Sequence, residues 1–399
     1  MQKRVILDSL FKFLGGFSVI VLALFLFILL FSVVEKGIGA FTSHKIKINL
    51  INTQNANDAQ NLNKILNESF FYTYPSLINS GLVADDIISN GSKVQLKTFL
   101  EQQKYEQNLG SIWLKTSSDI DLYLKGKKKL KNAEVENSIN ILVSQKSIVS
   151  GFNYEFFSLS DSQKVENAGI LGGLVSSIMV IIIALVIAFL FGLGGAVYFE
   201  EFASGYKKNK LVNFINNSSE LLIANLAGIP SIIYGLLGLW LFIGVLEMPR
   251  SSSIVGGLTL SFMMLPIIIV STRSSLKTVP KSLKEGAMAM GANKMQVLFH
   301  HTIPFAMPGI VTGTLLALAR IIGETSPLLV IGMVAFVAEA PSNIFAPSAP
   351  LPVQIYLWSD KPEAGFAEKA SGAIIVLLVI LSLFNYLAYY LRNKFERKL

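Results

Sequence analysis

The sequence predicts an all-α integral membrane protein with six transmembrane helices and a small α+β extracytoplasmic insert. Its 399 residues are 52% hydrophobic and only 15% charged, which is too apolar for a soluble domain of this length. The apolar residues also gather in six runs of the length that a helix, rising ~1.5 Å per residue, needs to cross ~30 Å of hydrocarbon. These runs lie near residues 13–34, 170–195, 219–246, 254–272, 304–336 and 371–391.

The charged residues exclude several functional classes. A net charge of +8 suits nucleic-acid binding only when basic residues cluster on a soluble face. Here the basic residues flank the apolar runs instead. The expected partner is therefore membrane lipid, and no nucleic acid is expected to bind. The chain has no cysteine, which excludes disulfides, thiolate metal sites and cysteine nucleophiles. His300 and His301 are adjacent and point to different helix faces, so no metal site is predicted.

The first apolar run resembles a signal peptide in its basic start, but it is far longer than a signal sequence and no cleavage site follows. Residues 1–36 are therefore predicted to be a retained signal-anchor helix. Cytoplasmic loops carry an excess of Lys and Arg. With the amino terminus inside, fifteen basic residues of the termini and short loops are cytoplasmic and three, Arg250, Lys361 and Lys369, are outside, so both termini are predicted to be cytoplasmic. The fifteen are Lys3, Arg4, Lys12, Lys207, Lys208, Lys210, Arg273, Lys277, Lys281, Lys284, Lys294, Arg392, Lys394, Arg397 and Lys398.

Residues 37–168 differ sharply in composition from the rest, with many asparagines and a basic cluster over 125–131. Apolar spacing is loosely helical over 56–70 and 93–108, whereas 139–159 is rich in β-branched and aromatic residues and predicts strand. The segment is therefore predicted to be a soluble α+β domain, which crosses the membrane regardless of its charge because it is long. We interpret it as a spacer, with a docking or sensing module as the alternative.

Residues 169–399 hold the other five runs, joined by mostly short loops, and have the size of one transmembrane domain, so a partner subunit is expected. Between the fourth and fifth runs, residues 275–304 are too polar to span a membrane. Good helix formers fill 281–290, Gly291 interrupts them and 293–301 resume the pattern. This arrangement predicts a helical hairpin with a glycine turn.

Glu285, followed six residues later by Gly291 and then by Pro304, resembles the EAA loop of ABC importer permeases. That pattern has Glu-Ala-Ala, a glycine six residues after the Glu, and a hydrophobic-Pro ending; Ala287 matches it, while Gly286 replaces the first Ala. The resemblance implies that these four residues, Glu285, Gly286, Ala287 and Gly291, couple the chain to a separate ATPase. A basic amphipathic helix resting on anionic lipid is the alternative.

Gly286 and Gly291 also have the glycine spacing of a phosphate-binding loop, but Ala292 and Asn293 follow where Lys and Ser/Thr are required. A nucleotide site is therefore not predicted in this chain. The resemblance implies that ATP and Mg²⁺ bind to the partner ATPase, that this chain holds no cofactor, and that it is not an enzyme.

A wider resemblance connects the chain with phosphate ABC importer permeases. It implies the type I importer transmembrane fold and transport of inorganic phosphate across a bacterial cytoplasmic (inner) membrane. The implied partners are two copies of an ATPase subunit, a second related permease and an extracytoplasmic phosphate-binding protein. The alternatives are a permease for another oxyanion, such as sulfate or molybdate, and, more remotely, a membrane-bound sensor. The similar stretches are 196–203, 225–242, 257–292, 316–329 and 351–366.

Arg320 and Glu324 lie four residues apart in the fifth run, so they are expected to share one helix face. Ionisable residues inside a membrane are costly unless they are paired or face a watery cavity, which marks them as candidates for a functional site. A guanidinium fits phosphate oxygens bidentately, and a carboxylate accepts a hydrogen bond from partly protonated phosphate that sulfate does not offer. Both residues are predicted to line the substrate pathway, with an internal ion pair as the alternative.

Three further residues are predicted to form a gate or hinge. Gly323 and Pro327 favour a bend in the fifth run, because the proline cannot donate a hydrogen bond to the carbonyl of Gly323. Pro230 and the glycines near it loosen the third run. Pro230 and these glycines have two possible roles, close packing of helices or a functional hinge, and the sequence does not decide between them.

Overall fold

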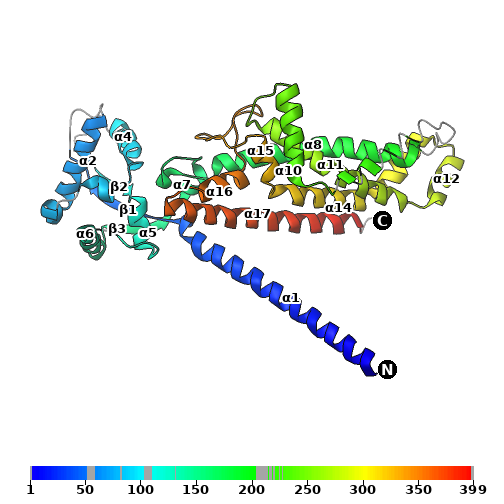
Figure 1. Cartoon of the computed structure of the whole chain (residues 1–399). Helices are drawn as coiled ribbons and strands as arrows, with labels where there is room; N and C mark the ends of the chain where they lie inside the picture. Colours follow the sequence, from blue (N-terminus) through cyan, green and yellow to red (C-terminus); the bar gives the residue numbers. More distant parts are fainter. Residues whose placement is uncertain are drawn as a thin grey trace. The chain divides into compact units, whose positions relative to one another are not determined.

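The computed structural model describes residues 2–51, 59–80, 83–102, 110–130, 132–203, 214, 218, 221–223, 225–226 and 228–396 (Figure 1). The chain divides into two compact units. Unit 1 consists of Met1–Ser158, Gln163–Ala168 and Trp358–Ile375, and unit 2 consists of Leu159–Ser162, Gly169–Leu357 and Val376–Leu399. Unit 1 therefore joins the first apolar run and most of the insert to the segment in which the last apolar helix begins.

Unit 1 is built on a three-stranded antiparallel sheet of order β2-β1-β3. The strands are β1 (Thr42–Asn49), β2 (Ser111–Lys115) and β3 (Ile148–Phe152). Ile46 of β1 lies opposite Leu114 on one side and Ile148 on the other. Because side chains alternate along a strand, Ile46 and Ile48 share a face and both are fully buried.

Helices cover this sheet and supply the rest of its core, which includes Phe70, Leu96 and Leu142. The α+β fold predicted for the insert is thus confirmed, and α2 and α4 confirm the helical segments within the part that is described. The strand predicted over 139–159 is correct only for β3. Its first part belongs to α6, because the side chain of Asn132 caps that helix by accepting from the amide of Glu134 and its apolar residues follow helical spacing. The helices are α2 (Ala59–Thr73), α3 (Ala84–Ile87), α4 (Ser92–Gln102), α5 (Ser118–Leu124), α6 (Ala133–Ser144) and α7 (Tyr154–Ser158).

Among the described residues, five helices are long and apolar enough to cross a membrane. They are built on α1 (Gln2–Gly37), α8 (Leu171–Val197), α11 (Ser253–Lys277), α14 (Ile303–Ile322) and α17 (Ala364–Glu396). The third predicted run, 219–246, corresponds to the shorter apolar helix Ser231–Val245, which comprises α10 (Ser231–Gly238) and a π-helical turn (Leu239–Val245). Residues 219, 220, 224 and 227 of that run lie outside the described residues.

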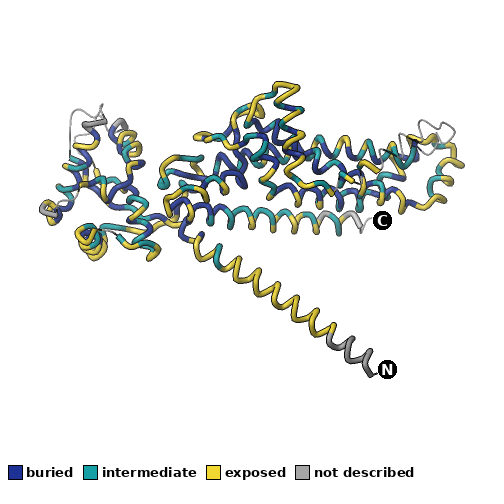
Figure 2. The backbone as a smooth tube through the Cα atoms, viewed as in Figure 1, coloured by how far each residue is buried: buried dark blue, intermediate teal, exposed yellow. Residues whose placement is uncertain are grey.

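Helix α1 exposes its apolar side chains. No residue in its most apolar 18-residue window is buried, and the described part of the helix is exposed along nearly its whole length (Figure 2). A helix that is apolar on all sides and has no protein neighbour is typical of a segment surrounded by lipid.

Unit 2 is held together by close contacts between α8, α11 and α14. Small residues make these contacts possible: Gly257 of α11 faces Ile183 of α8, and Gly313 of α14 faces Ser271 of α11. A side chain at either glycine would overlap the neighbouring helix. The loop of residues 275–304 follows α11 and leads into α14.

Candidate functional site

The fifth apolar run is not one helix. Helix α14 ends at Ile322, Gly323 caps it, and a separate short helix, α15 (Ser326–Val330), follows. The expectation that Arg320 and Glu324 share one helix face is therefore wrong, because Glu324 lies in the turn between the two helices. The helix ends here because Pro327 has no amide hydrogen to donate to the carbonyl of Gly323, which instead lies 3.4 Å from the hydroxyl of Thr325.

Arg320 and Glu324 do not neutralise each other. Arg320 is exposed and Glu324 is half-buried, and neither forms an ion pair among the residues that the structure describes. Arg320 lies within electrostatic range of Tyr234, whose hydroxyl donates to the carbonyl of Leu226 at 2.5 Å. The guanidinium and the carboxylate are therefore both available to other partners.

The three predicted hinge residues all fall at helix boundaries. Pro230 is the residue before α10, with φ −56° and ψ 137°, so it starts that helix rather than bending it. Pro327 is in the first turn of α15. The two helices meet at Gly235, where an added Cβ would lie 2.8 Å from Cα of Pro327. The break in the fifth run is therefore packed directly against the helix that begins at Pro230.

The loop of residues 275–304 forms the predicted hairpin. Helix α12 (Lys281–Ala289) is followed by Gly291, with φ +89°, and by α13 (Lys294–Val297), which continues into a π-helical turn (Leu298–Thr302). Asn293 caps α13 by accepting from the amide of Gln296 at 2.9 Å. The positive φ explains why glycine occupies position 291, because a residue with a Cβ is strained in that backbone conformation.

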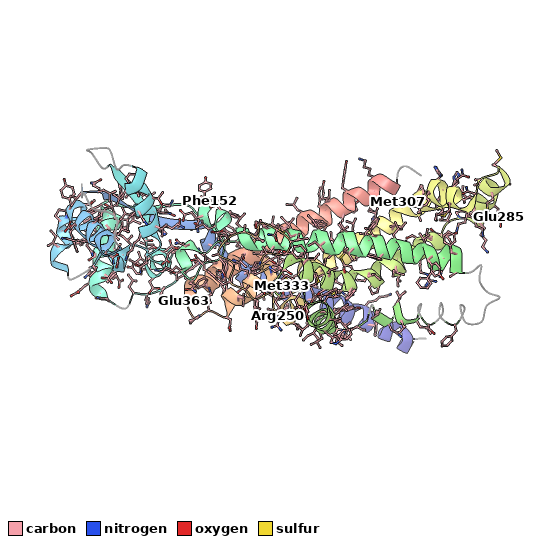
Figure 3. The ribbon with its side chains drawn as sticks, turned by 90° about the horizontal axis from the view of Figure 1, so that it is seen from above. Phe152, Arg250, Glu285, Met307, Met333 and Glu363 are labelled. Carbon is pink, nitrogen blue, oxygen red and sulfur yellow. The ribbon has the colours of Figure 1, made fainter. Side chains whose placement is uncertain are left out.

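The hairpin presents a largely unburied surface. No residue of α12 is buried; Glu285 and Gly286 are exposed, and Ala287 is half-buried. Glu285 lies near the outer end of the hairpin (Figure 3). Met290, next to the glycine turn, is 89% exposed. An exposed apolar side chain at a rigid turn is typical of a protein docking surface.

The inner side of the hairpin is tied to the long helices. Leu283 packs against a buried cluster that includes Leu276 of α11 and Val279, two residues beyond the end of that helix. Lys284 donates to Glu201, in the π-helical turn Tyr198–Phe202 that extends α8, at 2.5 Å. These contacts attach α12 to the ends of two apolar helices.

A second set of charged residues, in unit 1, was not predicted. Glu368, near the start of α17, lies between the ammonium groups of Lys125, at 2.9 Å, and Lys127, at 2.8 Å. The next residue, Lys369, is buried and donates to the carbonyl of Ala168. These residues line or adjoin a small pocket of about 30 Å³. The signals in the sequence were the basic cluster after α5 and a Glu-Lys pair at the start of an apolar run.

Buried charges shift the pKa values of two groups here. Burial lowers the pKa of Lys115, and its ion pair with Glu155 offsets this only in part. Burial alone would raise the pKa of Asp121, but hydrogen bonds from His44 and Lys125 and the charge of Lys125 lower it on balance. In the described part of the chain, no group of three or more His, Cys, Asp or Glu side chains is placed to hold a metal ion.

Residues 202–399 match the family described as binding-protein-dependent transport system inner membrane component, and residues 1–134 match a domain of unknown function, DUF3333. Among solved structures, a chain of the inward-facing MetNI methionine ABC transporter is similar with a TM-score of 0.43 and 16% identity, covering 56% of this chain and 94% of that chain. The probable ABC transporter permease protein YqgI of Bacillus subtilis is 31% identical over 264 residues, covering 63% of this chain and 87% of that protein. The phosphate transport system permease protein PstA of Mycobacterium leprae is 33% identical over 240 residues, covering 59% of this chain and 75% of that protein.

Proposed function

Since this chain belongs to the PstA family of ABC importer permeases, we propose that it is the permease subunit that carries inorganic phosphate into the cytoplasm. The observation that supports this most is its 33% identity with a phosphate transport permease over 75% of that protein's length. The chain is a multi-pass membrane protein. We infer from the family that it lies in the bacterial cytoplasmic membrane, and from the distribution of basic residues that both termini are inside.

The hairpin of residues 275–304 is the proposed contact with the ATPase. Its exposed side, with Glu285, Gly286 and Met290, has the accessibility and apolar character that a docking surface needs. Its inner side, through Leu283 and Lys284, is attached to the ends of α11 and α8. Ala287 and the turn at Gly291 keep the two sides in a fixed relation, so movement of the ATPase reaches the membrane helices.

Arg320 and Glu324 are the proposed substrate contacts. Arg320 attracts the anion with a guanidinium that matches two phosphate oxygens. Glu324 accepts a hydrogen bond from the P–OH group of partly protonated phosphate and repels fully ionised anions such as sulfate. The turn at Gly323 and the contact of Pro327 with α10 give this region two separately hinged short segments, which suits a gate.

The proposed assembly contains two copies of an ATPase subunit, which bind ATP and Mg²⁺, a second related permease and an extracytoplasmic phosphate-binding protein. No cofactor is assigned to this chain, and as a permease subunit it is not an enzyme. A transmembrane domain of this size is one half of the proposed pathway, and the second permease supplies the facing wall.

The test is phosphate uptake and phosphate-stimulated ATP hydrolysis in vesicles that contain the full assembly, with sulfate as competitor. Arg320→Gln should reduce phosphate uptake strongly, and Glu324→Gln should weaken phosphate uptake or admit sulfate, with assembly intact in both. Arg250→Gln is the matched control, because Arg250 is exposed and makes no ion pair among the described residues. Parental uptake and selectivity in both pathway variants would refute the pathway assignment, and better competition by sulfate than by phosphate in the parental assembly would refute the substrate.

A further inference from the structure

Five aromatic rings form a connected cluster in unit 1 that is buried at one end and exposed at the other. The ring centroids of Phe41 and Phe157 are 5.9 Å apart, those of Phe157 and Phe152 are 5.9 Å apart, and those of Phe152 and Tyr154 are 4.8 Å apart. Phe156 is fully buried and packs edge-on against Phe157, whereas Tyr154 is 74% exposed. We call these five residues the aromatic patch.

The aromatic patch begins where the first apolar helix ends. Helix α1 is exposed along its most apolar window, carries Lys36 in its last turn and ends at Gly37. A single 3-10 turn (Ile38–Phe41) then leads to Phe41, the first ring of the patch. Since α1 spans the membrane and a lysine at the end of such a helix reaches for the headgroups, the patch starts at the membrane surface.

The rings have the chemistry of that boundary layer. Tyr combines an apolar ring with a hydroxyl that needs water or a polar partner, and such side chains are enriched where hydrocarbon meets headgroups. Phe152 ends β3, which pairs with β1 on one side and forms an edge of the sheet. An open strand edge is not tolerated in hydrocarbon, because its backbone groups would lose their hydrogen bonds. The patch therefore suits the headgroup layer and not the bilayer interior.

We propose that the aromatic patch rests on the phospholipid leaflet on the insert's side of the membrane, with Tyr154 and Phe152 at headgroup depth. The continuity of the patch with the lipid-exposed α1 carries this assignment. An exposed apolar surface of this kind otherwise destabilises a soluble domain by inviting aggregation. Lipid contact at this point holds the insert against the membrane surface from which α1 emerges.

The test uses the full chain in vesicles of phosphatidylethanolamine and phosphatidylglycerol. Because the chain has no cysteine, one introduced cysteine gives a unique site for a nitroxide label. Tyr154→Cys places the label on the patch, and Tyr72→Cys is the matched control, an equally aromatic and 66% exposed position on α2 of the same insert. The ratio of collision with oxygen to collision with a water-soluble nickel chelate should be severalfold higher at residue 154 than at residue 72.

Phe152→Cys provides a second label position and should give a ratio between those two. Replacing Tyr154 removes little packing because the ring is mostly exposed, and the buried Phe156 remains to hold α7 in place. Equal ratios at residues 154 and 72 would overturn the proposal, since the patch would then stand in water. So would a label at 154 that becomes shielded only when the binding protein or the second permease is added, since the patch would then be a protein interface.

Discussion

Glu368→Gln is the substitution whose effect on unit 1 follows most directly from the structure. The Glu368 side chain is 7% exposed and its two carboxylate oxygens lie 2.9 Å from Nζ of Lys125 and 2.8 Å from Nζ of Lys127. Glutamine keeps the shape of the side chain and removes its charge. The ammonium groups of Lys125 and Lys127 then lie on either side of a neutral amide and lose the negative charge that they shared.

The loss of stability in Glu368→Gln depends on how well water or other polar groups compensate the charge of each lysine once the carboxylate is gone. Removing one partner of a buried ion pair costs about 3–5 kcal/mol. Lys127 is 28% exposed, so water compensates part of its charge, and Lys125 keeps Asp121 and the carbonyl of Thr42 at 2.9 Å. The expected loss of stability of unit 1 is therefore smaller, about 2–3 kcal/mol. This corresponds to a roughly 30- to 140-fold larger population of opened molecules.

The assay is hydrogen exchange of the full chain in lipid discs, followed on peptides that cover Lys125 and Lys127, directly after α5, and the start of β1, where the carbonyl of Thr42 accepts from Lys125. Glu363→Gln is the matched control, because Glu363 lies five residues earlier, is exposed and makes no ion pair among the described residues (Figure 3). In a double variant, Lys127→Gln should restore part of the lost protection by removing the uncompensated charge. Exchange that is no faster in Glu368→Gln than in Glu363→Gln would refute the assigned role of the ion pairs.

Gly291→Val should abolish uptake without lowering the amount of protein in the membrane, because φ +89° is strained for a β-branched residue. Normal uptake by the Gly291 variant would contradict the coupling assignment. The lowered pKa of Asp121, caused by His44 and Lys125 against the opposing effect of burial, implies that ionised Asp121 stabilises unit 1 above about pH 4 and that this stability is lost as the pH falls toward the lower pKa of the folded state. In Asp121→Asn, the hydrogen-exchange protection of unit 1 should therefore fall less steeply as the pH is lowered. The same pH dependence in the variant and the parental protein would contradict this.

Most of the apolar helices are predictable from the sequence because membrane burial imposes long uninterrupted apolar runs. The hairpin is predictable for a different reason, since Gly291 interrupts good helix formers where the backbone needs a positive φ. The end of α14 is not predictable in the same way. The apolar run continues through Gly323, so composition hides the point at which hydrogen bonding stops, and the relation of Arg320 to Glu324 was misjudged as a result.

The ion pairs of Glu368 were not predicted, because sequence patterns relate residues that are close along the chain and these partners are far apart in the sequence. Lys125 and Glu368 are 243 positions apart, so neither the basic cluster nor the Glu-Lys pair indicates that the other is its partner. Lys369 was counted among the basic residues of the outer loops, and the structure buries it, with its ammonium group donating to the carbonyl of Ala168. The strand predicted for residues that belong to α6 was wrong for a local reason. β-branched residues in a short segment fit a helix or a strand, and only the cap at Asn132 indicates the helix.

The contacts of Glu368 also bear on the two interpretations of the insert. A spacer needs no buried contact with a membrane helix, yet Lys125 and Lys127 of the insert hold a carboxylate at the start of α17. Removing the insert therefore leaves Glu368 and Lys369 without the groups that compensate them, and loss of uptake after such a deletion does not by itself reveal a docking role. A deletion that also neutralises both residues separates the two causes: restored uptake assigns the defect to the uncompensated charges, and continued loss assigns it to a surface of the insert that another molecule needs.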